Sequence, residues 1–307
     1  MALIVAFGNP VYDDITTPYV TTGGRVLSGC STNGCLALTR LGHQTTLVGG
    51  VGSDYHQRFL EDMQRYQVAT CLQPSAQTGG FCLIYDACGD RTLDVLGQAD
   101  VITLVPDVCA SAAAIIIGPI LQETPLHLIE RIRAISAAPL LLDPQGLLRR
   151  IDADGRVEHV MNPDMHAIAP LCTVIKANEV EARVLTGVDP RQEPFTAVQQ
   201  VRTLGCQIAI VTLAELGSVI DDGVRQYRIP AYATLARDST GAGDTYMAGF
   251  LHAYLHNPAD LFVAGCTGSA IASIWIEHTG PDAPVTMAEV LRRTAILVSQ
   301  YRDGGLR

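Results

Sequence analysis

Short apolar runs alternate with helical patterns along most of this chain. The apolar runs are three to five residues long and lack an inside–outside alternation, as expected for strands buried on both faces. Between them, apolar residues recur at the spacing of a helix that packs against a sheet. Strand and helix in this order predict an α/β fold with a mostly parallel sheet and helices on both faces. The predicted strands are 3–7, 44–48, 114–117, 140–142, 172–176 and 208–212, and the predicted helices are 31–41, 125–136, 179–186, 195–204, 243–256 and 260–277.

Two segments depart from this alternation. Residues 16–30 are rich in threonine and glycine with alternating valine and leucine, and residues 78–97 have the pattern of a hairpin. We expect the two segments, about 12–30 and 78–97, to form a small β lid beside the main sheet. No repeat, linker or low-complexity tract divides the chain, so residues 1–307 are predicted to form a single domain.

Composition narrows the class of protein. Hydrophobic residues make up 48% of the 307 residues and charged residues only 17%, which suits a large core and argues against disorder. The net charge of −10 argues against a nucleic-acid or anionic-membrane surface, although a local group of N–H donors can still bind an anion. The nine cysteines lack C-x-x-C or zinc spacing and indicate a reducing compartment. With no membrane span or signal segment in view, a cytoplasmic protein is expected.

Polar residues and glycines follow several of the predicted strands. In open parallel sheets the carboxyl ends of the strands meet at one edge, and ligands bind there. We therefore expect these residues to face one crevice. They are Asp13, Gly50, Asp143, Asn178 and Thr212.

The stretch Asp238–Thr245, with the sequence DSTGAGDT, carries the most specific chemistry. Apolar residues recur at helical spacing directly after it, so its glycine turn opens a helix. The free N–H groups and positive dipole end of that helix can face an anion. Asp244 lies in the first turn, where a carboxylate can take the proton from a hydroxyl that attacks a phosphoryl group. The alternative is an ordinary glycine turn with Asp244 as an N-terminal helix charge.

Further motifs accompany this stretch in a set order along the chain. They are GGVGSD at 49–54, Ser28-Gly29 with Asn33 and Arg40-Leu41-Gly42, Asp143-Pro144-Gln145-Gly146, and the N-x-x-E pair of Asn178 and Glu181. Together they resemble the ribokinase-like family, also called the PfkB carbohydrate kinases, from Ile4 to about Gly280. The resemblance implies the ribokinase-like three-layer fold. It also implies transfer of the γ-phosphoryl group of ATP to a hydroxyl of a small sugar, cyclitol or nucleoside.

The resemblance assigns catalytic and donor-binding roles to individual residues. Asp244 takes the role of general base, and the turn before it supplies backbone N–H groups to the phosphoryl oxygens. The residues of this anion hole are Gly241, Ala242 and Gly243. The residues expected to bind ATP are Asn178, Thr212, Gly217, Gly241 and Gly243.

The resemblance also concerns metal ions. Glu181 would organise Mg²⁺ through water, since Mg²⁺ usually keeps several waters. Asn178 and Glu181 also have the spacing of a plain helix capping box, and the two interpretations are compatible. In part of the family the positions of Asp238 and Thr240 bind a monovalent cation such as K⁺, whereas in turns such residues commonly bond to local backbone.

On the substrate side the resemblance points to Asp13, Gly29, Asn33 and Arg91. A carboxylate such as Asp13 can accept two hydrogen bonds from vicinal hydroxyls. The alternatives are a solvated loop aspartate for Asp13 and an exposed lid charge for Arg91.

Two departures from the family pattern bear on the substrate and the donor. Ser28-Gly29 stands where the family commonly has a glycine pair, so the acceptor pocket is expected to differ in shape. Thr212-Leu213-Ala214 carries alanine where the family often has Thr-x-Gly, and Gly217 follows three residues later. The segments 117–120 and 143–149 lean toward inositol-kinase-like members, but the acceptor stays open among sugars, cyclitols and nucleosides.

Other functions compete with a kinase. A catalytically silent ligand-binding protein of the same fold is the main alternative, and the presence of Asp244, the glycine turn and Glu181 disfavours it. A dinucleotide-binding enzyme is disfavoured because no G-x-G-x-x-G follows the first strand, and a Walker-type NTPase because no G-x-x-x-x-G-K-[ST] occurs.

Exposed lid strands invite pairing, so a homodimer through the lid is expected.

Overall fold

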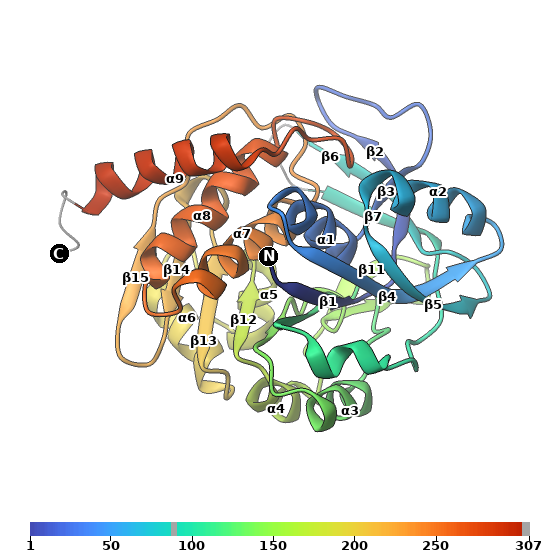
Figure 1. Cartoon of the computed structure of the whole chain (residues 1–307), viewed down its shortest axis with the longest axis horizontal. Helices are drawn as coiled ribbons and strands as arrows, with labels where there is room; N and C mark the ends of the chain where they lie inside the picture. Colours follow the sequence, from blue (N-terminus) through green and yellow to red (C-terminus); the bar gives the residue numbers. More distant parts are fainter. Residues whose placement is uncertain (87–90, 303–307) are drawn as a thin grey trace.

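A mostly parallel sheet forms the centre of the molecule (Figure 1). The computed structural model describes residues 1–86 and 91–302, and within them this sheet has nine strands in the order β15-β14-β13-β12-β9-β8-β1-β4-β5. Neighbours from β5 to β13 are parallel, whereas β14 and β15 add antiparallel strands at one edge. The strands of this sheet are β1 Leu3–Phe7, β4 Gln44–Gly52, β5 Ala69–Ser75, β8 Ala114–Ile117, β9 Leu140–Leu142, β12 Val174–Ala177, β13 Ile208–Thr212, β14 Ser218–Asp221 and β15 Gln226–Ile229.

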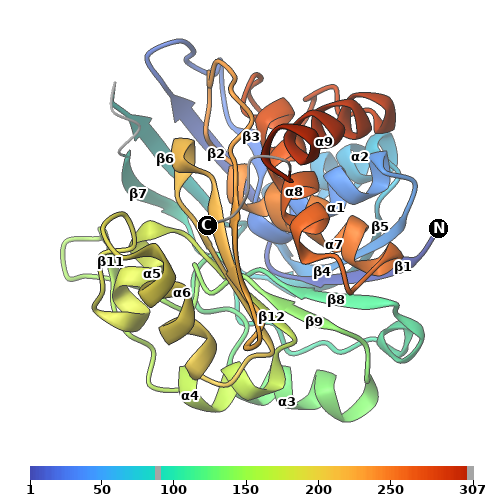
Figure 2. The ribbon, with the colours of Figure 1, turned by 90° about the vertical axis from the view of Figure 1, so that its left-hand side faces the viewer.

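Helices cover both faces of the sheet because its strands are apolar on both sides. On β1, Ile4 and Ala6 belong to the core beneath α1, α7 and α8, while Val5 and Phe7 belong to the core beneath α3 and α6. Figure 2 shows the two helical layers on opposite sides, with α9 outermost on one of them. The helices are α1 Cys30–Arg40, α2 His56–Tyr66, α3 Leu126–Ile135, α4 Met165–Ile168, α5 Glu179–Thr186, α6 Pro194–Thr203, α7 Ala242–His256, α8 Leu261–Trp275 and α9 Met287–Arg302.

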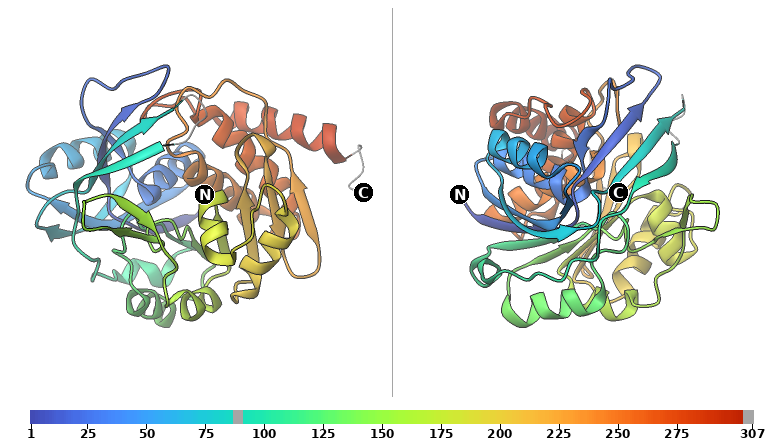
Figure 3. Two further views of the ribbon diagram at one scale, coloured as in Figure 1. Left: turned by 180° about the vertical axis from the view of Figure 1, so that it is seen from behind. Right: turned by 90° about the vertical axis from the view of Figure 1, so that its right-hand side faces the viewer.

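A second, four-stranded sheet comes from the two segments that break the alternation. Its order is β3-β2-β6-β7, with β2 and β6 parallel and the outer pairs antiparallel. Figure 3 shows it standing out beyond the helical layers. Residues 87–90 of the predicted hairpin lie outside the described residues. The strands are β2 Val11–Thr16, β3 Val26–Ser28, β6 Gly80–Tyr85 and β7 Arg91–Gly97, and a further short pair is β10 Arg149–Ile151 with β11 Val157–His159.

Not every residue expected at a strand end lies at one. Asp143 and Asn178 directly follow β9 and β12, and Thr212 ends β13, as predicted. Asp13 instead lies within β2, because the chain continues from the main sheet straight into the lid. Gly50 lies within β4, which extends to Gly52 through its pairing with β5.

The described residues include no helix that is both long enough and apolar enough to cross a membrane. The cysteines among these residues are free thiols, and six of them are buried. Cys88 lies outside the described residues.

Candidate active site

The helix α7 begins at a backbone turn that only glycine fits. Gly241 precedes the helix with φ of 82°, and a Cβ on it would lie 2.7 Å from Trp275 Nε1 and 2.9 Å from Asn33 Nδ2. Its carbonyl accepts the N–H of Thr245 at 2.9 Å, which closes the first turn. The Ala242 N–H donates to the Ser239 carbonyl at 3.2 Å, so one of the three predicted anion-hole groups has an internal acceptor here.

The carboxylate of Asp244 is buried in that first turn. Asn33 Nδ2, from the facing helix α1, donates to Asp244 Oδ2 at 2.9 Å. Burial and the nearby charge of Asp143 raise the pKa of Asp244, while the ammonium of Lys176 and the hydrogen bond from Asn33 oppose that rise. The result is an oriented carboxylate that is more basic than an exposed aspartate.

A buried ion pair lies directly beneath this turn. Lys176 Nζ, from β12, is 2.5 Å from Asp143 Oδ2, and both side chains are almost fully buried. Burial by itself would lower the pKa of Lys176, but the charges of Asp143 and Glu181 outweigh it and raise that pKa, so the ammonium is retained. A Cβ on Gly243 would lie 2.5 Å from Nζ. Glycine at 243 therefore makes room for the ammonium against the helix.

Asn178 and Glu181 form a complete capping box at the start of α5. The Glu181 N–H donates to Asn178 Oδ1 at 2.9 Å, and Glu181 Oε2 and Oε1 accept the N–H and side-chain amide of Asn178 at 2.8 and 2.6 Å. Burial and the charge of Asp143 raise the pKa of Glu181 to about 7, against the opposing charge of Lys176. The capping interpretation is thus correct for the local geometry.

Three potential metal ligands meet beside the ion pair. Cys30 Sγ and carboxylate oxygens of Asp143 and Asp244 lie within 4.8 Å of one another. Burial and the two carboxylates raise the pKa of the Cys30 thiol well above its usual range. Carboxylate oxygens suit Mg²⁺ but a thiol does not. Because Asp143 is already bound to Lys176 and Glu181 to Asn178, these carboxylates fit Mg²⁺ best through intervening water.

The predicted substrate residues lie around the start of α1 and the lid. Gly29 is the N-cap of α1 with φ of 116°, and a Cβ on it would lie 3.2 Å from the Asn9 carbonyl. Asp13 is buried, and its Oδ1 accepts the N–H of Phe81 from β6 at 2.8 Å, so it is not a solvated loop aspartate. The backbone of Arg91 pairs with Tyr85 at the start of β7, and its side chain lies outside the described part of the chain.

The remaining predicted residues lie on either side of α7. Asp238 Oδ1 accepts the Thr240 N–H at 2.9 Å, and the Thr240 hydroxyl contacts the Tyr85 hydroxyl at 2.9 Å, so the K⁺ site stays a prediction.

Thr212 ends β13 with its hydroxyl 3.5 Å from the Ala177 carbonyl. A Cβ on Gly217 would lie 2.0 Å from the Ile229 carbonyl, which explains glycine there by backbone packing. Ala214, in place of the family glycine, adopts a positive φ of 45°.

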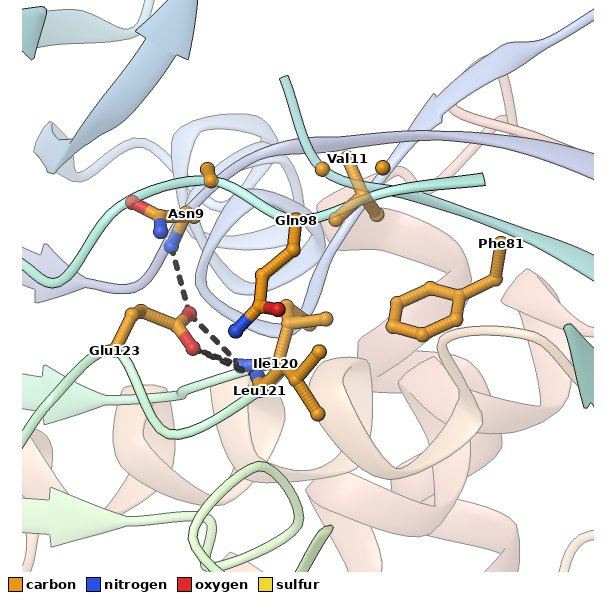
Figure 4. A pocket seen from close by; sticks show the side chains of 10 residues that line it. Asn9, Val11, Phe81, Gln98, Ile120, Leu121 and Glu123 are labelled. Carbon is orange, nitrogen blue, oxygen red and sulfur yellow. Dashed lines mark hydrogen bonds between the residues drawn. The ribbon is translucent and has the colours of Figure 1, made fainter. Parts of the chain in front are cut away.

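A small cavity lies between the lid and the ends of β1 and β8 (Figure 4). The buried carboxylate of Glu123 accepts the backbone N–H groups of Asn9, Ile120 and Leu121 at 2.7 to 3.0 Å. Burial raises the pKa of Glu123 despite these hydrogen bonds. The side chain of Gln98 lies between Glu123 and Phe81 in Figure 4. The full lining is Asn9, Val11, Gly79, Phe81, Gly97, Gln98, Ala99, Ile120, Leu121 and Glu123.

Lys176, Glu123 and Asn9 had no predicted role. Lys176 had a usable signal, since it is a single charged residue inside an apolar strand and such charges are rarely buried without a partner. Asp54, part of the GGVGSD motif, accepts the N–H and hydroxyl of Thr78 at 3.1 and 2.7 Å and so holds the segment that leads into the lid.

Comparison with known proteins gives one family and several solved folds. Residues 3–287 match the model of the pfkB family carbohydrate kinase. A ribokinase of Staphylococcus aureus is 25% identical over 272 residues, covering 85% of each chain. A pyrophosphate-dependent kinase in the ribokinase family, complexed with a pyrophosphate analog and myo-inositol, superposes with a TM-score of 0.78 at 21% identity, covering 94% of this chain and 99% of that one. A nucleoside kinase of Burkholderia thailandensis in complex with inosine has a TM-score of 0.75 at 21% identity, covering 96% of both chains.

Replacing Lys176 by methionine should destabilise the protein strongly, because Asp143 would be left as a buried, unpaired charge. We expect a loss of about 3–5 kcal/mol in the free energy of unfolding, measured by chemical denaturation. The matched control is Arg150→Met, which breaks the exposed Arg150–Glu158 pair and should cost under about 1 kcal/mol. Equal losses in the two variants would show that Asp143 does not depend on Lys176.

Proposed function

Because this chain belongs to the pfkB family of carbohydrate kinases, we propose that it transfers the γ-phosphoryl group of ATP to a hydroxyl of a small sugar, cyclitol or nucleoside. The predicted family and the ribokinase-like fold are confirmed, and the enzyme is a phosphotransferase with a hydroxyl acceptor. The single observation that carries the finer proposal is the buried Asp244 carboxylate, oriented by Asn33 in the first turn of α7.

Asp244 supplies the base. Its carboxylate accepts the proton of the acceptor hydroxyl while the hydroxyl oxygen bonds to the γ-phosphorus of ATP. The bond from that phosphorus to the β–γ bridging oxygen breaks, and ADP leaves with the electron pair. A raised pKa suits this role, since a base is most effective when its pKa lies nearer the working pH.

Backbone N–H groups and an ammonium would stabilise the negative charge on the transferring phosphoryl group. The turn Gly241-Ala242-Gly243 opens α7 at the positive end of its dipole, and Lys176 Nζ lies against Gly243. Mg²⁺, when bound with ATP, would neutralise charge on the phosphate oxygens. Asp143 and Glu181 are the carboxylates that would hold its waters. Asn178, Thr212 and Gly217 remain the proposed nucleotide side of the site.

We take the cavity of Figure 4 as the acceptor cavity. Few of its polar groups are free, which favours a substrate with an apolar ring face. Glu123 is occupied by backbone N–H groups, and the Asn9 amide binds the Gly50 N–H at 2.7 Å and the Asp100 carbonyl at 2.9 Å. A polyol placed there would lose hydration and find few free partners other than the Gln98 amide. The Phe81 ring is only 3% exposed, so we propose that the lid opens to let a base stack on this ring, with the Gln98 amide at the edge of the base.

The cavity lies close to the start of α1, the helix that carries Asn33. A Cβ on Gly29 would lie 3.4 Å from the Val11 N–H, and one turn further along α1 Asn33 binds Asp244. A nucleoside with its base in the cavity can therefore direct a ribose hydroxyl toward Asp244. We place nucleosides ahead of free sugars and cyclitols as the acceptor class.

A homodimer through the lid is also proposed. The edges of the lid sheet are β3 and β7, and Ile84 on β6 is 48% exposed. Open edges and exposed apolar side chains invite pairing with a second lid. A monomeric mass in solution would reject this proposal.

Asp244→Asn should lower kcat by about 10²–10⁴-fold and leave the Kd for ATP nearly unchanged, because only proton transfer is lost. Turnover is measured with ATP and with pyrophosphate as donors, against a panel of nucleosides, ribose and myo-inositol. Asp154→Asn, at an exposed carboxylate, is the matched control. If no acceptor supports turnover with either donor while one raises the melting temperature, the protein is the silent ligand-binding alternative.

The pH profile should report the raised pKa of Asp244. The base works only when deprotonated, so kcat/KM should fall with unit slope as the pH drops through that pKa, above the ordinary aspartate value of about 4. Asn33→Leu removes a donor that favours the charged carboxylate and should move this limb to higher pH. A profile that stays flat down to about pH 4 would contradict the assignment.

Phe81→Ala should raise KM for a nucleoside by about 5–150-fold, the effect of losing one base–aromatic stack of about 1–3 kcal/mol. KM for ribose should change much less, and Phe195→Ala on α6 is the control. Good turnover of ribose or myo-inositol without turnover of nucleosides would reject the acceptor class and leave the kinase proposal standing.

A further inference from the structure

Three histidines meet at the end of α7 that is remote from Asp244. His252 and His256 lie one turn apart on α7, with ring centroids 4.7 Å apart. His43, in the connection between α1 and β4, places its Nε2 2.8 Å from His252 Nδ1, and its ring centroid is 6.5 Å from that of His256. With a rise of 1.5 Å per residue, His252 lies about 12 Å along the helix from Asp244.

Burial favours the neutral form of His43 and His252. His43 is buried, His252 is half-buried and His256 is exposed. Burial, followed by the proximity of His43 and His256, lowers the pKa of His252 to about 4. Burial, the chain's N-terminal amine and His256 lower the pKa of His43. Neutral imidazoles have the lone pairs that a metal ion requires.

The hydrogen bonds show which ring nitrogens are available. His256 Nδ1 is 2.7 Å from the His252 carbonyl. Because a carbonyl only accepts, the proton of His256 is on Nδ1, and the lone pair of its Nε2 is free to bind a ligand. Between His43 Nε2 and His252 Nδ1 there is one shared proton. A metal ion can replace the shared proton if that proton moves to the other nitrogen of the ring that donates it. Metal binding to the neutral pair then releases no proton.

We propose that His43, His252 and His256 bind one divalent first-row transition-metal ion, for which Zn²⁺ is the probe. The ligands are His43 Nε2, His252 Nδ1 and His256 Nε2, with water as the fourth. Imidazole nitrogens suit Zn²⁺, Ni²⁺ and Cu²⁺, and three of them with one water in tetrahedral geometry are typical of Zn²⁺, whereas Mg²⁺ prefers oxygen. A rotation of the exposed His256 side chain completes the set, since the His43–His252 pair is already in place.

The bound ion would tie α7 to the start of β4, which lies inside the sheet between β1 and β5. His43 directly precedes β4, and the Gln44 N–H donates to the Ala2 carbonyl at 2.9 Å just before β1. An ion that bridges His43 and His252 would therefore join α7, the helix that carries Asp244, to strands β1 and β4. The expected consequence is a higher melting temperature with unchanged basal turnover, because His252 lies about 12 Å along the helix from Asp244.

The test is calorimetric titration of untagged, chelator-treated protein with Zn²⁺. We expect one ion per chain, a rise in melting temperature, and at least a tenfold loss of affinity in His256→Gln, whose exposed side chain can be replaced without disturbing the fold. His252→Gln should lose affinity similarly, and His127→Gln, exposed on α3, should bind like the wild type. Cobalt-loaded protein should show visible bands of nitrogen coordination that disappear with His256→Gln.

A second variant separates this cluster from the active site. Cys30→Ala removes the thiol from the group near Asp143 and Asp244, and binding at the histidine cluster should persist in it. Zinc binding that is lost with Cys30→Ala and kept with His256→Gln would overturn the proposal. So would the absence of binding, or binding that depends on His43 and His252 but is insensitive to His256→Gln, which would reduce the cluster to a hydrogen-bonded pair.

Discussion

The buried ion pair between Lys176 and Asp143 is the constraint on which the active site depends. Its charges are out of water, so each requires the other, and the ammonium also has two further carboxylates around it, Glu181 and Asp244. Burial, followed by the negative charge of Asp143, raises the pKa values of Glu181 and Asp244, and the single ammonium of Lys176 only partly opposes this rise. The same ammonium excludes any side chain at Gly243 and so sets how α7 can begin.

The sheet explains how this pair comes together. β9 and β12 are parallel neighbours, so the residue that follows β9 and a residue near the end of β12 lie side by side. α1 and α7 pack over the same face, and their contact brings Asn33 to Asp244. The Asp244 carboxylate is thus held by a helix contact above the sheet and by charged groups at the ends of β9 and β12. Neither contribution requires a side chain from the flexible end of a loop.

Local patterns in the sequence were sufficient for some of these features and not for others. The strand–helix alternation, the glycine turn at 241–243 and the capping box of Asn178 and Glu181 are set by residues close in the chain, and the structure contains them. The partner of Lys176 is 33 residues away, and Glu123 reaches the Asn9 N–H across 114 residues, so no local period encodes either contact. Asp13 was misplaced at a strand end because nothing local marks where the chain leaves the main sheet for the lid.

The lid bonds both to the segment before α7 and, through Asp13 and Phe81, to itself beside the cavity of Figure 4. Asp13 binds the Phe81 N–H beside the cavity, while Tyr85, further along the same strand β6, contacts the Thr240 hydroxyl just before the glycine turn 241–243. The backbone carbonyl of Thr240 accepts the Trp275 Nε1–H at 3.1 Å, and Nε1 is the group that a side chain at Gly241 would meet. A shift of β6 on filling the cavity would therefore be felt at the turn that precedes Asp244. In a kinase this linkage has a use, because a site that forms fully only around the acceptor protects the phosphoryl donor from water.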